Sequence, residues 1–250
     1  MKEQLYTAPV NEAFLSEDEC PFCYLQRQTE QRIIRYVAGP GASYMEPDVR
    51  GATDSLGFCA NHFKKLYDYG NSLGNALIMQ TYLIGLRKEL EQQLDDFEMP
   101  GKKPLFGKRE SSESPIVGWL REKEKSCFLC DRIAYNMERY YASFFYLVNK
   151  DAEFRKRFEE SNGLCLHHMA DILMAANDHL GNGQQAWFYA TVSNLQRKHF
   201  ARVQGDLDWF IEKFDYRNAS ADWKNSRDAV SRTMQKLAGI YPADQPYRQN

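Results

Sequence analysis

Four short pairs of cysteine and histidine residues limit what this 250-residue chain can fold into. In chain order they are a CxxC pair at Cys20 and Cys23, a CxxH pair at Cys59 and His62, a CxxC pair at Cys127 and Cys130, and a CxxH pair at Cys165 and His168. Together the pairs use all six cysteines of the chain. Two intervening residues allow one turn or helix start to present both side chains to a single ion, so the pattern indicates metal binding.

The pairs are arranged as an internal duplication. The two CxxC pairs are offset by 107 positions and the two CxxH pairs by 106, and 35 and 34 residues separate the pairs within the first and second half. A Leu-Gly-Asn tripeptide recurs at residues 73–75 and 180–182, and Gly57 and Gly163 each stand two residues before a CxxH cysteine. Each half is therefore expected to be one supersecondary unit, copied once.

Each half supplies three cysteines and one histidine, the donor set of a tetrahedral structural zinc site. We predict two Zn²⁺ ions per chain, one in each half. The predicted ligands are Cys20, Cys23, Cys59 and His62 in the first half, and Cys127, Cys130, Cys165 and His168 in the second. A filled Cys₃His shell has no open position for water or substrate, which disfavours catalysis at the ion. Because the pairs lie far apart in sequence, an exchange of ligands between the halves stays open.

Other uses of the cysteines remain as alternatives. Disulfides are disfavoured in a chain that begins without a signal peptide, whereas redox-active thiols, an iron–sulfur cluster and buried unligated cysteines stay open. His168 matches His62 in spacing, so His167 is expected to be a neighbour of the site. Three thiolates give a zinc site a net negative charge, and Lys64 and Lys65 follow His62 as candidate counter-charges.

The apolar periodicity predicts an all-α fold of two tandem pseudo-symmetric repeats, each clamped by a Cys₃His site, plus a C-terminal helix. Two long helices are expected at about residues 73–98 and 184–214. Their apolar faces are formed by Met79, Leu83, Leu86, Leu90, Leu94 and Phe97, and by Phe188, Val192, Leu195, His199, Val203, Leu207, Phe210 and Phe214. No run of residues alternates as a strand would.

Composition shifts divide the chain further. We expect an N-terminal repeat at residues 1–98, a flexible linker at 99–118, a second repeat at 119–214, and a C-terminal helix and tail at 215–250. Eight of the 17 residues from 99 to 115 are Pro, Gly or Ser, which is typical of an exposed linker. The last ten residues contain two prolines and are expected to fray.

Charge and hydropathy exclude two classes of partner. With 32 basic and 34 acidic side chains the net charge is −2 and the pI is about 6.2, whereas dedicated nucleic-acid binders are usually basic. No stretch approaches the roughly 20 apolar residues that span a bilayer. The first residues lack the apolar run of a signal peptide, so we expect a cytoplasmic protein. An unknown protein or small molecule is the expected partner, and homo-oligomer formation stays open.

These features favour a non-enzymatic helical scaffold that structural zinc supports and that recognises a partner. One alternative is a switch in which oxidation of the thiols ejects zinc. A second is an enzyme with a site away from the metals, for example among Tyr44, Glu46, Asp48 and the aromatic side chains at residues 135–146, although nothing in the sequence indicates a reaction. Whether the chain is an enzyme is left undecided. His199, on an apolar helix face, is expected to be a hydrogen-bonded core residue.

Several longer motifs carry a family resemblance. They are residues 6–14 before the first CxxC, the segments 43–50 and 57–62 around the first CxxH, and residues 213–218 and 228–233 near the end. From Tyr6 to about Gly239 the chain resembles an uncharacterised bacterial family, domain-of-unknown-function family 6062. The resemblance implies a cytoplasmic bacterial protein without an established activity.

Overall fold

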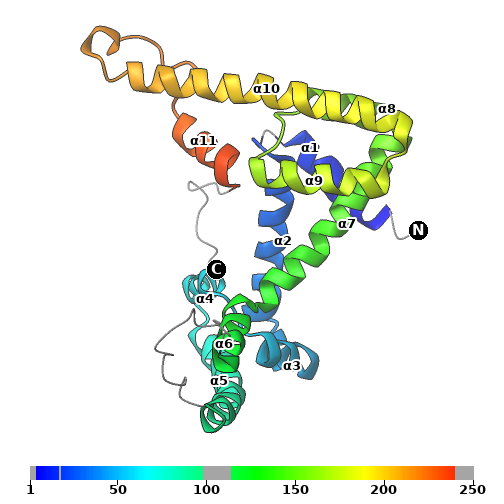
Figure 1. Ribbon diagram of the computed structural model, residues 1–250. Helices are drawn as coiled ribbons and strands as arrows, with labels where there is room; N and C mark the ends of the chain where they lie inside the picture. Colours follow the sequence, from blue (N-terminus) through cyan, green and yellow to red (C-terminus); the bar gives the residue numbers. More distant parts are fainter. Residues whose placement is uncertain (1–3, 17, 98–113, 240–250) are drawn as a thin grey trace, which may run out of the picture. The chain divides into compact units, whose positions relative to one another are not determined.

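The computed structural model describes residues 4–16, 18–97 and 114–239, and within these ranges every regular element is a helix (Figure 1). The helices of the first half are α1 (Gln4–Leu15), α2 (Pro21–Ala38), η1 (Ser43–Met45), α3 (Pro47–Leu56), α4 (Ala60–Tyr69) and α5 (Ser72–Asp95). Those of the second half are α6 (Pro115–Lys125), α7 (Phe128–Lys150), α8 (Ala152–Glu160), α9 (Leu166–His179), α10 (Asn182–Glu212), η2 (Tyr216–Asn218) and α11 (Ala229–Ala238). The predicted all-α class is confirmed. No helix among the described residues is long and apolar enough to cross a bilayer.

The chain folds into two compact units. Unit 1 takes its described residues from the ranges Met1–Thr29 and Ala134–Gln245, and unit 2 takes them from Glu30–Ile133. Helices α2 and α7 therefore contribute residues to both units. The units cut across the two sequence repeats, so the predicted repeat boundaries at residues 98 and 118 do not coincide with them.

An aromatic cluster forms the core of unit 1. Phe144 of α7 lies with its ring centroid 5.5 Å from that of Phe14, 5.4 Å from that of Phe22 and 5.0 Å from that of Phe158. These rings come from four different helices and are all buried, as is Phe188 of α10. Since burial of one such side chain contributes about 1.5–3 kcal/mol, this cluster supplies much of the stability of unit 1.

The core of unit 2 is smaller and mainly aliphatic. It joins Ile34 and Val37 of α2 with Val49 of α3, Leu66 of α4 and Ile78 of α5. Cys127 and the start of α7 belong to the same core. The first turn of α7 is thus fixed by packing, which positions the second CxxC pair.

Both predicted long helices are present, but only α10 buries most of its expected apolar face. On α10 the stripe from Phe188 to Val203 is buried, whereas Phe214, which was predicted on the same face, lies beyond the end of the helix and is exposed. The apolar face predicted for α5 is not buried, which corrects the expectation. Only Ile78 is a buried apolar residue of this helix, while Met79, Leu83 and Leu94 are exposed, as is Phe97 beyond its end. A 3.6-residue period identifies a helix but does not supply a surface to cover it.

The predicted linker lies mostly outside the described residues. Its last residues, from Pro115, form the first turn of α6, which contacts α5 through an ion pair of 2.6 Å between Lys123 Nζ and Glu89 Oε2. The predicted C-terminal helix is confirmed as α11. Residues 241–250, expected to fray, lie outside the described part of the chain.

Candidate metal centres

The eight predicted residues form two groups whose ligand atoms lie within 4.8 Å of one another. Cluster 1, in unit 1, consists of Cys20, Cys23, Cys165 and His168, and cluster 2, in unit 2, consists of Cys59, His62, Cys127 and Cys130. Each CxxC pair therefore meets the CxxH pair of the other repeat. The expectation of one site within each half is wrong, and the exchange of ligands that the sequence left open is what the structure contains.

Cluster 1 is built around one imidazole nitrogen. The Nδ1 atom of His168 lies 3.6 Å from the Sγ of Cys20, 3.4 Å from that of Cys23 and 3.2 Å from that of Cys165. The sulfurs of Cys23 and Cys165 are 3.5 Å apart, well beyond the roughly 2.05 Å of a disulfide bond. All four side chains are at most 1% exposed. The four donor atoms thus enclose one small, dry space.

Cluster 2 repeats this arrangement. The Nδ1 atom of His62 lies 3.3 Å from the Sγ of Cys59, 3.2 Å from that of Cys127 and 3.4 Å from that of Cys130. The sulfurs of Cys59 and Cys130 are 3.9 Å apart. His62 and Cys127 are buried, Cys59 is half-buried and Cys130 is exposed. The two clusters therefore share their geometry but differ in their access to solvent.

Two helix N-termini meet at each cluster. Cys59 and Cys165 are the N-cap residues of α4 and α9, with backbone angles (φ, ψ) of −71°, 164° and −73°, 164°. Cys20 and Cys127 each immediately precede the helix that carries the second cysteine of their pair. Unpaired N–H groups and the positive end of the helix dipole favour negative charge there, so the helices stabilise thiolates.

A glycine with positive φ redirects the chain before each CxxH pair. Gly57 has φ 59° and ψ −152°, and Gly163 has φ 77°. The carbonyl of Gly57 accepts a hydrogen bond of 3.0 Å from the N–H of Phe128, which attaches this turn to the start of α7. Around Leu164, the side-chain amide of Gln196 makes bonds of 3.0 and 3.1 Å to the backbone N–H and carbonyl. The turns thus place the CxxH pairs against the CxxC helices.

We expect Gly57→Ala to destabilise unit 2 by about 1–3 kcal/mol, because its backbone conformation is one that essentially only glycine adopts. A Cβ atom there would also lie 2.4 Å from the ring of Tyr82. Gly51→Ala is the matched control, since it lies within α3 with nothing within 4 Å of its added Cβ and should stabilise the helix by up to about 1 kcal/mol. Urea denaturation of both variants measures the difference, and equal midpoints would contradict the expectation.

Each cluster favours an ionised thiol. In cluster 1, hydrogen bonds from Cys20 and Cys23 lower the pKa of Cys165 well below its ordinary value. In cluster 2, burial raises the pKa of Cys127, but the hydrogen bond with His62 and one from the backbone N–H of Cys130 outweigh it and lower the pKa to about 6. The thiolate is the form of cysteine that binds metals, so both donor sets suit a cation.

A carboxylate orients the histidine of cluster 2. The Nε2 atom of His62 hydrogen-bonds to Oε1 of Glu30 at 3.0 Å, and the other oxygen of Glu30 accepts a bond of 2.6 Å from Lys65. Burial raises the pKa of Glu30, but these two hydrogen bonds outweigh it and lower the pKa below its ordinary value. A carboxylate on one ring nitrogen leaves the other aimed at the thiolates, as in many metal sites. Lys65, but not Lys64, which pairs with Asp68, thus belongs to the surroundings of the site.

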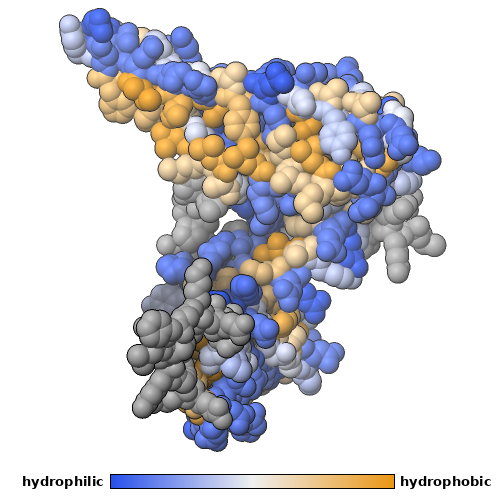
Figure 2. Space-filling view, viewed as in Figure 1, coloured by the Kyte–Doolittle hydropathy of each residue, from blue (hydrophilic) through white to orange (hydrophobic). Residues whose placement is uncertain are grey.

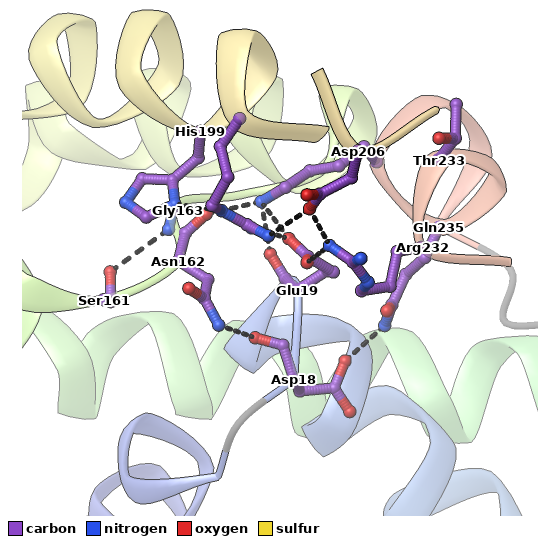
Figure 3. Close-up of polar contacts among 12 residues, drawn as sticks. Asp18, Glu19, Ser161, Asn162, Gly163, His199, Asp206, Arg232, Thr233 and Gln235 are labelled. Carbon is purple, nitrogen blue, oxygen red and sulfur yellow. Dashed lines mark hydrogen bonds and ion pairs between the residues drawn. The ribbon is translucent and has the colours of Figure 1, made fainter. Parts of the chain in front are cut away.

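A buried ionic network surrounds Glu19, the residue that precedes Cys20 of cluster 1 (Figure 3). Glu19 is 3% exposed and faces three cations: Arg202 at 2.6 Å, Lys236 at 3.3 Å and Arg232 at 3.4 Å. Burial raises the pKa of Glu19, but Arg202 and Lys236 outweigh it and lower the pKa below its ordinary value. Asp206 also pairs with Arg232, at 2.8 Å. The network connects the start of α2 with α10 and α11.

Helix α11 covers cluster 1. Lys236, 1% exposed, donates to the backbone carbonyls of Glu19 and Asn162, and burial lowers its pKa more than the charges of Glu19 and Cys20 raise it. At the end of the helix, a Cβ atom on Gly239 would lie 3.5 Å from the sulfur of Cys165. The buried lysine and the glycine thus contribute to the burial of this cluster.

Sequence reasoning missed Glu19, Glu30 and Lys236, because an isolated charged residue gives no signal of burial in a single sequence. His167, the alternative to His168, is exposed and lies 3.5 Å from Asp171, outside the thiolate group. His199 is buried as expected, with its Nδ1 accepting a bond of 3.1 Å from Arg202. Burial and the nearby cations, Arg202 first among them, lower its pKa to about 4, so it is neutral at pH 7.

No curated protein and no solved structure matches this chain. A family model matches almost the whole sequence, from residue 1 to residue 244, and this range includes all eight residues of the two clusters. The chain therefore belongs to the family of unknown function DUF6062.

Proposed function

We propose that each cluster binds one Zn²⁺ ion, giving two ions per chain, and that these ions hold together a non-enzymatic helical scaffold. Cys20, Cys23, Cys165 and His168 would hold the first ion, and Cys59, His62, Cys127 and Cys130 the second. The spacing of the donor atoms is the observation that carries this proposal.

In a tetrahedral zinc site with ordinary bond lengths, two sulfurs lie about 3.8 Å apart, and a sulfur and a nitrogen lie about 3.6 Å apart. The measured sulfur–sulfur distances are 3.5 and 3.9 Å. The sulfur–nitrogen distances range from 3.2 to 3.6 Å. All of these distances lie within about 0.4 Å of the values for a filled site, so the spacing of the donor atoms supports a Cys₃His tetrahedron.

A structural role follows from the complete donor set. Four protein ligands leave no position at which the ion could bind water or a substrate. A catalytic site that combines Tyr44 with Glu46 and Asp48 is not supported, because Tyr44 is buried in the core of unit 2 while Glu46 and Asp48 are exposed. The ions instead join chain segments that are distant in sequence, for example Cys20 with His168, 148 positions away.

The scaffold would serve to recognise a partner. Hydrophobic side chains gather on the surface along α10 and α11 (Figure 2). They include Ile211 of α10, Phe214 just beyond the end of that helix, and Val230, Met234 and Leu237 of α11, all exposed. Exposed apolar faces suit a protein or small-molecule partner, or a second copy of the chain, and the near-neutral charge does not suit nucleic acid. A cytoplasmic, reducing location would keep the thiolates available to zinc.

Double variants test both the metal and the crossed pairing. Cys23→Ser combined with His168→Ala removes two ligands of the same cluster, so one zinc per chain should remain. Cys23→Ser combined with His62→Ala removes one ligand from each cluster, so both ions should be lost. Elemental analysis of the purified proteins, after passage over a chelating resin, measures the number of zinc ions per chain.

The wild-type chain and the single variants serve as controls, with two ions and one ion expected. Pairing within each repeat would reverse the results of the two double variants. Iron, or no metal in the wild-type protein, would overturn the zinc proposal itself. Circular dichroism at 222 nm on the same samples reports whether the helices of the affected unit persist.

A further inference from the structure

We propose that cluster 2, and not cluster 1, is a peroxide-reactive metal site in which oxidation of Cys130 releases the zinc ion. This inference rests on the proposed function, because it needs an ion in both clusters. It assigns different roles to two sites that have the same ligands: a permanent ion in unit 1 and a releasable one in unit 2.

The sulfur atoms of the two clusters differ in their access to solvent. Cys130 is exposed and Cys59 is half-buried, whereas the three cysteines of cluster 1 are fully buried. Zinc-bound thiolates remain nucleophilic, so an oxidant in solution reacts with the sulfur that it can reach. Only cluster 2 presents such a sulfur.

Cluster 1 is also covered by helix α11. Gly239 at the end of α11 lies against the sulfurs of Cys23 and Cys165, where its notional Cβ would be 3.7 and 3.5 Å away. Lys236 is held beside it by two backbone carbonyls and by Glu19. An oxidant that approaches from this side can reach the two sulfurs only after α11 leaves, which requires breaking this buried ionic network.

The chemistry needs only a peroxide as oxidant. The thiolate of Cys130 attacks one oxygen of hydrogen peroxide, forming an S–O bond, breaking the O–O bond and releasing hydroxide. A second thiolate then attacks the sulfenic sulfur, forming a disulfide and releasing another hydroxide. The two thiolates lose two electrons, which reduce the peroxide, and both hydroxides take up protons to become water. Only His62 and Cys127 would then remain as ligands, which would not suffice to hold a zinc ion.

Cys59 is the second thiolate. Its sulfur lies 3.9 Å from that of Cys130, and its partial exposure allows it to move. Cys127 is fully buried, and its sulfur is held by His62 at 3.2 Å and by the backbone N–H of Cys130 at 3.5 Å. The oxidised chain should therefore contain a Cys59–Cys130 disulfide.

The experiment uses the full chain after its zinc content has been measured as two per chain. Hydrogen peroxide is added with a chromogenic zinc chelator present, and the cysteines are then mapped by alkylation and mass spectrometry. We expect release of one ion, with Cys59 and Cys130 joined and Cys20, Cys23 and Cys165 still reduced. The second ion should leave at least about tenfold more slowly, since its thiolates are shielded. Thiol reductant and added zinc should restore two ions.

Cys130→His separates the oxidation from ion binding. Position 130 is exposed, so an imidazole has room there, and the resulting Cys₂His₂ donor set still suits zinc. This variant should keep two ions and release the cluster 2 ion at least about tenfold more slowly, while cluster 1 is the internal control in every sample. Simultaneous release of both ions, faster loss from cluster 1, or unchanged release in Cys130→His would overturn the inference. A wild-type chain without two zinc ions would instead overturn the proposed function.

Discussion

His168→Ala is expected to remove the ion of cluster 1 and to unfold unit 1 at ambient temperature. His168 supplies the one nitrogen that faces all three sulfurs of this cluster, at 3.2 to 3.6 Å. A structural zinc ion contributes about 10–16 kcal/mol in small zinc-binding peptides, whereas a whole domain is stable by only about 5–15 kcal/mol. Loss of the ion therefore removes an amount comparable to the entire stability of the unit.

His167→Ala is the matched control, since the neighbouring imidazole is exposed and lies outside the cluster. It should keep both ions and change the free energy of unfolding by no more than about 0.5 kcal/mol. Both variants are compared by their zinc content after treatment with a chelating resin and by their thermal unfolding, followed by circular dichroism. Two ions and an unchanged Tm in His168→Ala, or loss of an ion in His167→Ala, would refute the assignment.

Glu19→Gln is expected to lower the free energy of unfolding by about 3–5 kcal/mol without removing zinc. The substitution keeps the shape of the side chain but leaves Lys236, which is 1% exposed, without its carboxylate partner. A buried charge that loses its partner typically costs this much. The effect should be large because Arg202 and Arg232 also face Glu19.

Glu91→Gln provides the comparison, because Glu91 is exposed on α5 and its ion pair with Arg87 is a surface pair at 3.6 Å. Such pairs contribute about 0–1 kcal/mol. Urea denaturation compares the two variants at equal zinc content. Adding Lys236→Met to Glu19→Gln should recover part of the loss, since the unpaired charge is then absent. A loss below about 1 kcal/mol in Glu19→Gln would show that the network does not stabilise the fold.

The local structure of the clusters could be predicted from the sequence. A spacing of two residues places both members of a pair on one helix start, and Pro21 occupies the first position of α2, where its missing N–H group costs no hydrogen bond. The Leu-Gly-Asn and glycine repeats marked the duplication, and the 3.6-residue period marked the long helices. Each of these features depends on residues only a few positions apart, which is the range over which sequence patterns are informative.

The partners of these local elements were decided only by the tertiary structure. The four pairs are chemically equivalent, so nothing local states that Cys23 meets Cys165, 142 positions away, and not Cys59. The exposure of the α5 stripe had the same origin, since periodicity does not name the surface that covers a helix. The burial of Glu19 and Lys236 and the exposure of Cys130 likewise depend on which helices pack together. Sequence thus determined which residues act in pairs, and long-range packing determined which pairs meet and which of them solvent can reach.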